Sequence, residues 1–261
     1  MADRNTITHE LTARWAKEQA VIREKIEYTD DVDWSIDGDN DGDSALKFVG
    51  GLDVSFYKDD SKRDKAMAAL VVLTYPELKV VFDDYEDIDL EVPYIPGFLA
   101  FRECPAFHKL LARVASTEFN PQVLLVDGNG ILHPRGCGCA SHLGVESRYP
   151  TIGVAKNLHC IQGLDEKAIK TEVRRRMSSS NTTGDGIYPL VGSSGSTLGA
   201  AVYGHGKGTV VPIYVSTGHR ISLELGIELV KKCSLCRIPE PIRQADLRSR
   251  RIVRKEEAHG S

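Results

Sequence analysis

Three strand-like runs close together in the first third of the chain constrain its fold most. They read LKFVGGLDVSFY (46–57), AMAALVVLTY (66–75) and LKVVFDDYEDIDLE (78–91), and Val, Leu, Phe and Tyr are frequent in them. Short polar connections, KDDSKRDK and a Pro-Glu pair, join each run to the next. Strand-forming runs with such short connections pair as antiparallel neighbours, so we expect a three-stranded meander.

Helices and strands alternate after this meander. Apolar spacing predicts helices over 97–116, 165–178 and 221–233, in addition to an amphipathic helix over 8–27. Further apolar runs predict strands: 121–130, 151–157, YPLVGSS, TLGAAVYG and TVVPIYVS. We therefore expect an α/β fold with a mixed central sheet flanked by helices. The order β-β-β-α-β-α-β-α resembles that of an RNase H-like sheet.

The 261 residues are 41% hydrophobic and 27% charged, which is enough for one large core. Because we find no linker or repeat, we predict a single domain over 8–250 and a basic, disordered tail over 251–261. No run approaches the ~18 apolar residues of a membrane span. The polar N-terminal residues do not resemble a secretory signal, so we expect a cytoplasmic or nuclear protein with reduced thiols.

Charge is unevenly distributed, although the net charge is only −4. Basic residues gather in Lys170–Arg176 and in RQADLRSRRIVRK (243–255), whereas acids gather in 30–43 and 83–91. A basic segment can supply contacts to nucleic-acid phosphates, or it can be an ordinary solvated surface. Charge alone does not separate these two interpretations.

Two aspartates stand in or at the end of apolar strands. Asp53 lies inside FVGGLDVSF, and Asp127 ends VLLVDG. A buried carboxylate needs a partner, and two carboxylates on neighbouring strands could hold one divalent ion such as Mg²⁺. Glu103, on the helix between these strands, and Asp246, in IPEPIRQADLRS, are further candidates. Each acid could instead be a structural group held by backbone N–H groups or a salt bridge.

A lysine and a histidine follow the same strands. Lys156 comes after TIGVA, where a cation could stabilise negative charge on a phosphate. His133, in DGNGILHPRG, could position water or phosphate. Taken alone, each fits a surface group better. Four glycines near His133 let the backbone approach a ligand or form a mobile loop: Gly128, Gly130, Gly136 and Gly138.

The six cysteines include the pairs Cys137-x-Cys139 and Cys233-x-x-Cys236. These four thiols could hold zinc if their loops met, or form a redox-sensitive pair. The pairs lie far apart in sequence and no histidine completes either half. We therefore expect free thiols rather than structural Zn²⁺.

The segment VPYIPGFLAFRE (92–103) holds Tyr94 between two prolines. Proline fixes φ and restricts the residue before it, so Pro93 to Pro96 should form a stiff, extended or turn-like element. The predicted helix that carries Glu103 follows at once.

Seven segments together resemble, in order, the motifs of the endonuclease V family. They are GLDVSF, VPYIPGFLAFRE, LLVDGNGILHPR, ASHLGV, TIGVAKN, STGHRISLE and IPEPIRQAD. Each motif is short, but seven in this order, with PYIP followed by FRE, are highly specific. The match runs from Leu46 to Asp246, and the cysteines and basic tail resemble the animal form.

This resemblance implies an RNase H-like enzyme that uses Mg²⁺, with Mn²⁺ able to substitute. It implies recognition of hypoxanthine, the base of inosine, in single-stranded RNA and also of deoxyinosine in DNA. Hydrolysis would fall at the second phosphodiester bond on the 3′ side and leave 3′-hydroxyl and 5′-phosphate ends. We expect a monomer that lies in the cytoplasm and the nucleus, including the nucleolus.

The same resemblance assigns roles to residues by motif. Asp53 and Asp127 would bind the metal, where an activated water attacks phosphorus. The other catalytic candidates are Glu103, Lys156, His133 and Asp246. Asp246 stands where many bacterial members have histidine, which leaves its role open. The substrate-binding candidates are Pro93, Tyr94, Ile95 and Pro96 as a wedge beside the displaced base, and Leu99, Gly128 and Gly138 as the lining of the base pocket.

Two alternatives stay open. Another RNase H-like nuclease, such as a junction resolvase or a hybrid ribonuclease, would share the acids but would not explain PYIP. A non-cleaving module that binds inosine-containing RNA would require loss of a metal ligand. Against such a loss, the sequence has four of the family's expected residues: Asp53, Glu103, Asp127 and Lys156.

Overall fold

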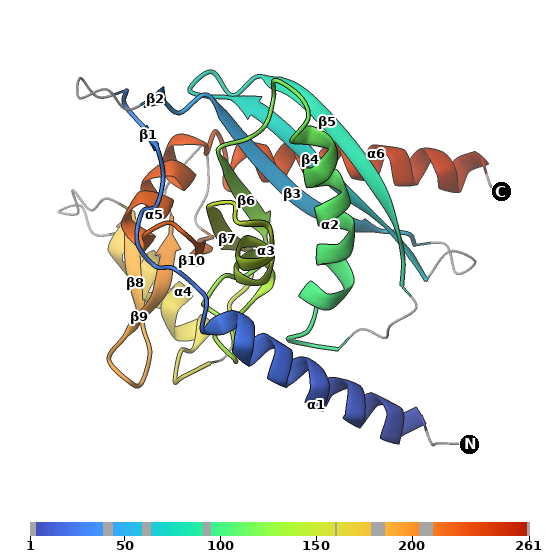
Figure 1. Cartoon of the computed structure of the whole chain (residues 1–261). Helices are drawn as coiled ribbons and strands as arrows, with labels where there is room; N and C mark the ends of the chain where they lie inside the picture. Colours follow the sequence, from blue (N-terminus) through green and yellow to red (C-terminus); the bar gives the residue numbers. More distant parts are fainter. Residues whose placement is uncertain are drawn as a thin grey trace.

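The computed structural model describes residues 4–38, 44–58, 64–90, 95–159, 161–178, 186–203 and 211–259. Within them, eight strands form one sheet in the order β5-β4-β3-β6-β7-β10-β9-β8 (Figure 1). The strands are β3 Phe48–Phe56, β4 Lys65–Thr74, β5 Val80–Asp89, β6 Val123–Asp127, β7 Thr151–Ala155, β8 Ile187–Val191, β9 Thr197–Val202 and β10 Ile213–His219. Two short strands, β1 Trp34–Ser35 and β2 Ser44–Ala45, pair separately.

The strand directions confirm the predicted meander and the mixed sheet. β4 lies antiparallel to both β3 and β5. β3, β6 and β7 are parallel neighbours, and β10 returns antiparallel to β7. An antiparallel meander that continues into parallel strands joined by helices is the RNase H-like arrangement predicted from the element order.

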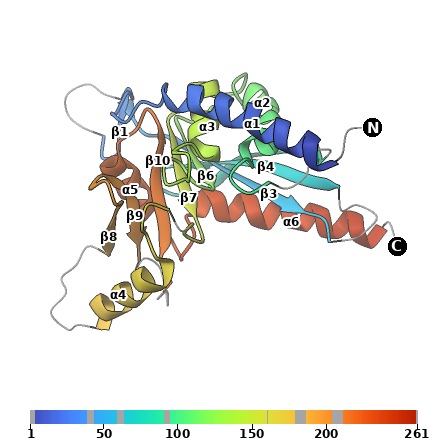
Figure 2. The same cartoon turned by 90° about the horizontal axis from the view of Figure 1, so that it is seen from below.

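Helices cover the two faces of this sheet (Figure 2). α1 (Arg4–Arg23), α2 (Ala100–Val114) and α3 (Cys139–Ser147) lie on one face, and α6 (Glu240–His259) lies on the other. Side chains alternate along β6, so Leu124 and Val126 pack into the core beneath α2 and α3. Val123 and Leu125 pack into the opposite core with residues of α5 (Leu223–Lys232).

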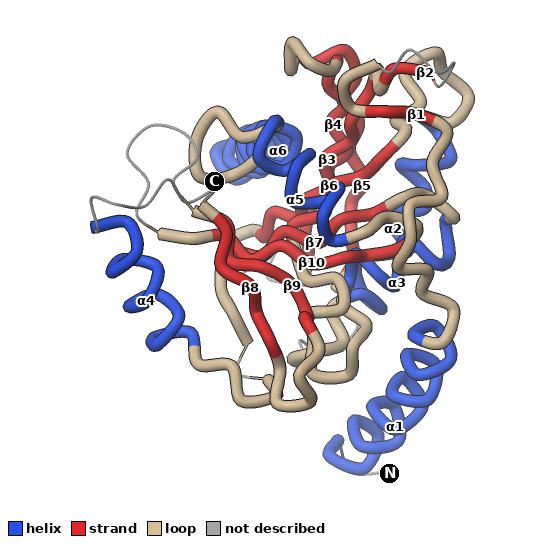
Figure 3. The backbone as a smooth tube through the Cα atoms, turned by 90° about the vertical axis from the view of Figure 1, so that its left-hand side faces the viewer, coloured by secondary structure: helices blue, strands red, loops and turns tan. Residues whose placement is uncertain are grey.

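α4 (Glu166–Ser178) stands apart, beside the far edge of the sheet (Figure 3). Its Ile169 and Val173 are buried against Leu190 of β8 and Ala201 of β9. No helix among the described residues is long and apolar enough to cross a membrane.

The C-terminal segment corrects one expectation. Residues 251–259, predicted to belong to a disordered tail, continue α6 as a helix. Four buried residues of α6 repeat at helical spacing: Ile242, Ala245, Ser249 and Val253. The many arginines between these residues make the segment resemble a charged tail in sequence, although one face of the helix is buried. That residues 8–250 form a single domain stays a prediction.

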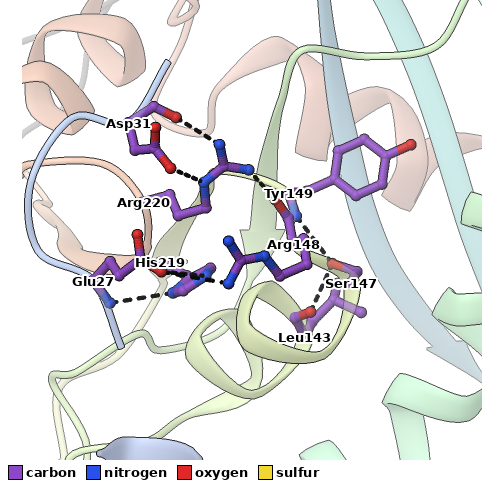
Figure 4. Close-up of polar contacts among 8 residues, drawn as sticks. All are labelled: Glu27, Asp31, Leu143, Ser147, Arg148, Tyr149, His219 and Arg220. Carbon is purple, nitrogen blue, oxygen red and sulfur yellow. Dashed lines mark hydrogen bonds and ion pairs between the residues drawn. The ribbon is translucent and has the colours of Figure 1, made fainter. Parts of the chain in front are cut away.

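The chain after α1 is tied to the end of β10 by a polar cluster (Figure 4). The Arg220 guanidinium binds Asp31 Oδ2 at 2.7 Å and donates to the Arg148 carbonyl at 2.5 Å. The Glu27 backbone N–H donates to His219 Nδ1 at 3.2 Å. The His-Arg pair of STGHRISLE therefore anchors the N-terminal segment to the sheet.

Candidate active site

The parallel pairing of β3 and β6 brings the two predicted metal ligands together. Leu52 is registered with Val126, so Asp53 and Asp127 follow as neighbours. Lys156 follows β7, the next parallel strand, and its ammonium pairs with Asp127 and lies 4.0 Å from Asp53 Oδ1. Groups that follow parallel strands meet at one edge of a sheet, which is where open α/β sheets bind ligands.

Asp53 is the most electrostatically strained group of this cluster. Its side chain is 5% exposed, and its Oδ2 is buried with no hydrogen-bond partner among the described residues. Burial, followed by the hydrogen bond and the charge of Asp127, raises the pKa of Asp53 well above its usual value. Burial lowers the pKa of Lys156, but the charge and hydrogen bond of Asp127 outweigh it, so the net pKa is raised.

Two further acids approach this cluster from opposite faces of the sheet. Glu103 comes from the first turn of α2, and burial, with a contribution from the charge of Asp127, raises its pKa to about 7. Asp246 comes from α6, and its charge acts on both Asp53 and Lys156. Asp53, Asp127, Glu103 and Asp246 thus interact electrostatically within one cluster, and their catalytic roles stay predictions.

This donor set fits a divalent cation. Carboxylate oxygens are the ligands that Mg²⁺ prefers. Carboxylates held close together in a buried position repel one another, and Asp53 Oδ2 has lost water without gaining another partner. A cation bound by Asp53 and Asp127 would relieve both costs.

A cavity of about 290 Å³ adjoins the acids. Candidates for the reaction centre and candidates for the base pocket line it together: Glu103, Asp127, Lys156, His133, Leu99, Gly128 and Gly138. Asp53 and Asp246 do not line it. The sequence-predicted base pocket and the acidic site are thus parts of one depression.

The glycine-rich loop forms a fixed wall of this cavity. Gly138 donates from its backbone N–H to the Gly130 carbonyl at 2.9 Å, and the Gly130 N–H donates to Ser216 Oγ at 2.9 Å. A Cβ on Gly138 would lie 2.2 Å from the Asn129 carbonyl oxygen, so only glycine allows this approach. These close contacts within the protein hold the loop in one conformation, and approach of its backbone to a ligand stays a prediction.

The described part of the PYIP segment leads directly into the cavity wall. Pro93 and Tyr94 lie outside the described residues, Ile95 is half-buried and Pro96 is exposed. Gly97 follows with φ +81°, and its carbonyl accepts hydrogen bonds from Arg135 and, at 3.2 Å, from Gln19 Nε2. These contacts hold Gly97, the residue that follows the predicted wedge, beside the base pocket.

His133 lies at the Gly97 end of the cavity. It is 6% exposed, and its Nδ1 accepts a hydrogen bond from the Arg135 N–H at 3.3 Å. Burial, followed by the charges of Arg135 and His159, lowers the pKa of His133 to about 4. A neutral imidazole at this position is suited to hydrogen bonding rather than to charge neutralisation.

Sequence reasoning missed several residues of the cavity: Gln19, Asn129, Asn157 and His159. Asn129 and Asn157 lie inside the family motifs, each next to a predicted site residue, so the sequence could have indicated them. Gln19 lies outside every motif. It is 1% exposed on α1, donates to the Cys137 carbonyl at 2.5 Å and accepts from Arg135 Nε at 2.5 Å.

The cysteine pairs do not form one four-thiol zinc site. Cys139 packs in the core beneath α2 and α3, whereas Cys233 packs in the core on the opposite face of the sheet. No disulfide joins the cysteines that the structure describes: Cys104, Cys137, Cys139, Cys233 and Cys236. Cys160 lies outside the described residues.

Comparison with known proteins identifies the family of this chain. The family Endonuclease V matches residues 30–247. Endonuclease V of Mus musculus is 48% identical over 248 residues, which cover 94% of this chain and 70% of the relative. Endonuclease V of Homo sapiens is 46% identical over 248 residues, covering 94% and 84% of the two chains.

Two solved structures share the fold over nearly the whole chain. The catalytic domain of human Endonuclease V has a TM-score of 0.85 and 45% identity, and covers 95% of this chain and 98% of its own. Endonuclease V of Ciona intestinalis, solved with a 24mer DNA containing an inosine followed by a ribo-adenosine, has a TM-score of 0.84 and 37% identity, covering 94% and 99%. This chain therefore belongs to the Endonuclease V family of nucleases, which are phosphodiester hydrolases.

Proposed function

We propose that this protein is an inosine-specific, Mg²⁺-dependent endoribonuclease. One observation carries the proposal: a single cavity is lined both by glycines of the predicted base pocket, Gly128 and Gly138, and by acids of the predicted reaction centre, Glu103 and Asp127. A base inserted against the backbone wall places its own phosphodiester chain beside the acids. Related Endonuclease V from Ciona intestinalis has been solved with inosine-containing nucleic acid, which supports the same substrate here.

Base selection follows from the polar groups of the cavity. Hypoxanthine differs from adenine at O6 and N1–H, and from guanine by lacking the 2-amino group. The buried Oδ1 of Asn129 has no hydrogen-bond partner among the described residues, so it offers an acceptor to a bound base. Leaving such a group unpaired beside the wrong base is costly, and this cost gives strong discrimination. Gly128 and Gly138 allow the base to approach the backbone closely.

The acids and Lys156 serve the hydrolysis. Asp53 and Asp127 would hold Mg²⁺, or Mn²⁺ in its place, and a bound ion would activate water and neutralise phosphate charge. Lys156 stays protonated at neutral pH because the carboxylates raise its pKa, so it can stabilise charge developing on the scissile phosphate. Glu103 extends the acidic wall toward the base pocket. The charge of Asp246 adds a small contribution at Asp53 from the other face of the sheet.

The C-terminal helix supplies contacts to the nucleic-acid backbone. Arg250 pairs with Asp246 at 2.7 Å, and the exposed residues Arg251 and Arg254 follow it on α6. Such residues bind phosphates without reading sequence. A monomer that acts on single-stranded RNA in the cytoplasm and nucleus fits this surface, and deoxyinosine in DNA is a second substrate.

The test uses end-labelled single-stranded RNA with one inosine, and matched RNAs with adenosine or guanosine at that position. With Mg²⁺ we expect one cut, at the second phosphodiester bond 3′ to inosine, with 3′-hydroxyl and 5′-phosphate ends. The cut should disappear with EDTA and with Asp53→Asn. Cleavage of all three RNAs at equal rates would favour a nuclease of other specificity. Tight inosine-dependent binding without any cut would refute the enzyme assignment.

A further inference from the structure

A second cluster of ligand-type side chains lies between α2 and α3, outside the catalytic cavity. α2 contributes Cys104 and His108, and α3 contributes His142 and Glu146. Both pairs have i, i+4 spacing, which places the two members of a pair on the same face of their helix. The packing of α2 against α3 turns the two pairs toward each other.

The side chains are close enough to share one ion. One ligand atom from each of Cys104, His142 and Glu146 lies within 4.8 Å of the other two. His142 Nε2 lies 3.1 Å from Glu146 Oε1, and His108 Nε2 lies 2.8 Å from Glu146 Oε2. Zn²⁺ forms bonds of about 2.0–2.3 Å to such ligands, so the three ligand atoms must move closer together, and rotation of the side chains allows this.

One buried atom of the cluster lacks a partner. The His142 side chain is 4% exposed, yet its Nδ1 has no hydrogen-bond partner among the described residues. The edge-to-face contact with Phe101, at 4.8 Å between ring centroids, fixes the orientation of the imidazole. A histidine ring that is held in one position, and that has a nitrogen without a hydrogen-bond partner, is suited to bind a metal ion.

The cluster also has an entry path. The Glu146 side chain is 40% exposed and opens into a surface depression between α1, α2 and α3. Cys104, by contrast, is 1% exposed and closes the inner end. An ion can therefore enter from solvent at the carboxylate and reach the thiol.

We propose that Cys104, His142 and Glu146 bind one Zn²⁺ ion, with His108 holding the second carboxylate oxygen of Glu146. A thiolate, an imidazole and a carboxylate together select zinc-like transition metals over Mg²⁺. Binding replaces the Cys104 thiol proton, which is released to solvent as the sulfur–zinc bond forms. The site differs from the four-thiol arrangement excluded above, and it does not depend on the proposed RNA specificity.

The site would also stiffen the active site. Cys104 follows Glu103 on α2, and Cys139, which is hydrogen-bonded to Cys104, donates to Glu103 Oε2 at 3.5 Å. An ion that joins α2 to α3 therefore fixes the helices that carry Glu103 and the pocket residue Gly138. Zinc should stabilise the protein without taking part in hydrolysis.

The test is titration of the full chain, stripped of metal, with Co²⁺ and then with Zn²⁺. Co²⁺ should give the visible absorption bands of a tetrahedral site and a sulfur-to-metal charge-transfer band, both lost when one equivalent of Zn²⁺ is added. Cys104→Ala and Glu146→Gln, which remove direct ligands, should lower the Zn²⁺ affinity more than ~100-fold, and His108→Ala about 10- to 100-fold. Cys236→Ser, a partly exposed thiol elsewhere, should bind like the wild type.

Glu146→Gln keeps the size of a partly exposed side chain, so it tests the proposal even if Cys104→Ala fails to fold. Binding that survives both substitutions would overturn the proposal. Loss of the Co²⁺ bands in Asp53→Asn, with retention in Glu146→Gln, would also overturn it, because the ion would then sit at the catalytic acids. Absence of any tetrahedral Co²⁺ spectrum would have the same meaning.

Discussion

Glu103 and Cys104 are neighbours on α2, yet they serve two clusters of opposite character. The strand-end cluster gathers Asp53 and Asp127 with Lys156, from three parallel strands. The helix cluster gathers i, i+4 pairs from α2 and α3, and Glu146 contacts both His108 and His142. The first holds a buried acid with an unpaired oxygen, whereas in the second the carboxylate is fully engaged.

This difference between the clusters indicates that the strand-end cluster serves the reaction, whereas the helix cluster contributes to stability. Buried like charges cost folding free energy and persist where they serve a ligand or a reaction. Engaged carboxylates on a helix surface contribute modest stability and impose little strain. Substitutions at the strand ends should therefore abolish activity without loosening the fold, and substitutions in the helix cluster should do the reverse.

Asp53→Asn should give the largest effect. Substituting groups that only orient a metal ligand costs about 10- to 100-fold, so loss of a ligand should lower inosine cleavage by more than ~100-fold. Because the substitution removes a strained buried charge, the melting temperature should stay equal or rise. Single-turnover cleavage and thermal unfolding check both outcomes. A large fall in melting temperature would make Asp53 a structural acid.

Gly138→Ala tests the backbone wall of the catalytic cavity. The added Cβ would meet the Asn129 carbonyl at 2.2 Å, so the backbone must move, at a cost of about 1–3 kcal/mol of stability. Discrimination of inosine from adenosine should fall about 10-fold. Gly195→Ala is the control: at φ +83° the added Cβ strains a turn that does not line the cavity, so discrimination should match the wild type. Equal discrimination in both variants would remove Gly138 from the base pocket.

His133→Gln tests a buried neutral group through pH. The pKa of His133 falls from 6.5 to about 4 on folding, so above pH 6.5 both states are neutral and nothing is lost. Between pH 6.5 and 4 the unfolded state binds a proton that the folded state does not. Wild-type stability should then fall by about 1.4 kcal/mol per pH unit from this residue. Urea unfolding at pH 7 and pH 5 should show a smaller loss in the variant.

Glu146→Gln should give the smallest effect in metal-free protein. It weakens the contacts with two histidines, so the free energy of unfolding should fall by about 0.5–1.5 kcal/mol. Cleavage with Mg²⁺ should stay within about twofold, because Glu146 does not line the catalytic cavity. A loss of cleavage as large as that of Asp53→Asn would erase the distinction between the clusters.

The strand-end cluster could be predicted from the sequence, and the helix cluster could not. Asp53 and Asp127 stand out because an acid in an apolar strand is costly, and strand order alone makes them neighbours. Cys104 and Glu146 are ordinary residues of amphipathic or short helices, and α3 was not predicted. Only the packing of α2 on α3 joins them, and one-dimensional patterns do not encode that packing.

The contributions of the two terminal helices could not be predicted from the sequence for a similar reason. Gln19 lies on a helix without a motif, and its value comes from two partners more than a hundred residues away, Arg135 and the Cys137 carbonyl. In α6 the arginines dominate the composition and conceal the buried stripe. Local sequence patterns indicate the secondary structure of a segment, whereas the roles of Gln19 and of α6 depend on contacts with residues far away in the sequence.

The anchoring of both terminal helices has a practical consequence for protein engineering. A chain trimmed to residues 30–247, where the family match begins and ends, would lose Gln19 from the cavity wall. It would also lose Ser249, whose Oγ meets Ser55 Oγ at 2.7 Å on the strand that carries Asp53. Shortened versions of the protein should therefore keep α1 and α6, which carry Gln19 and Ser249.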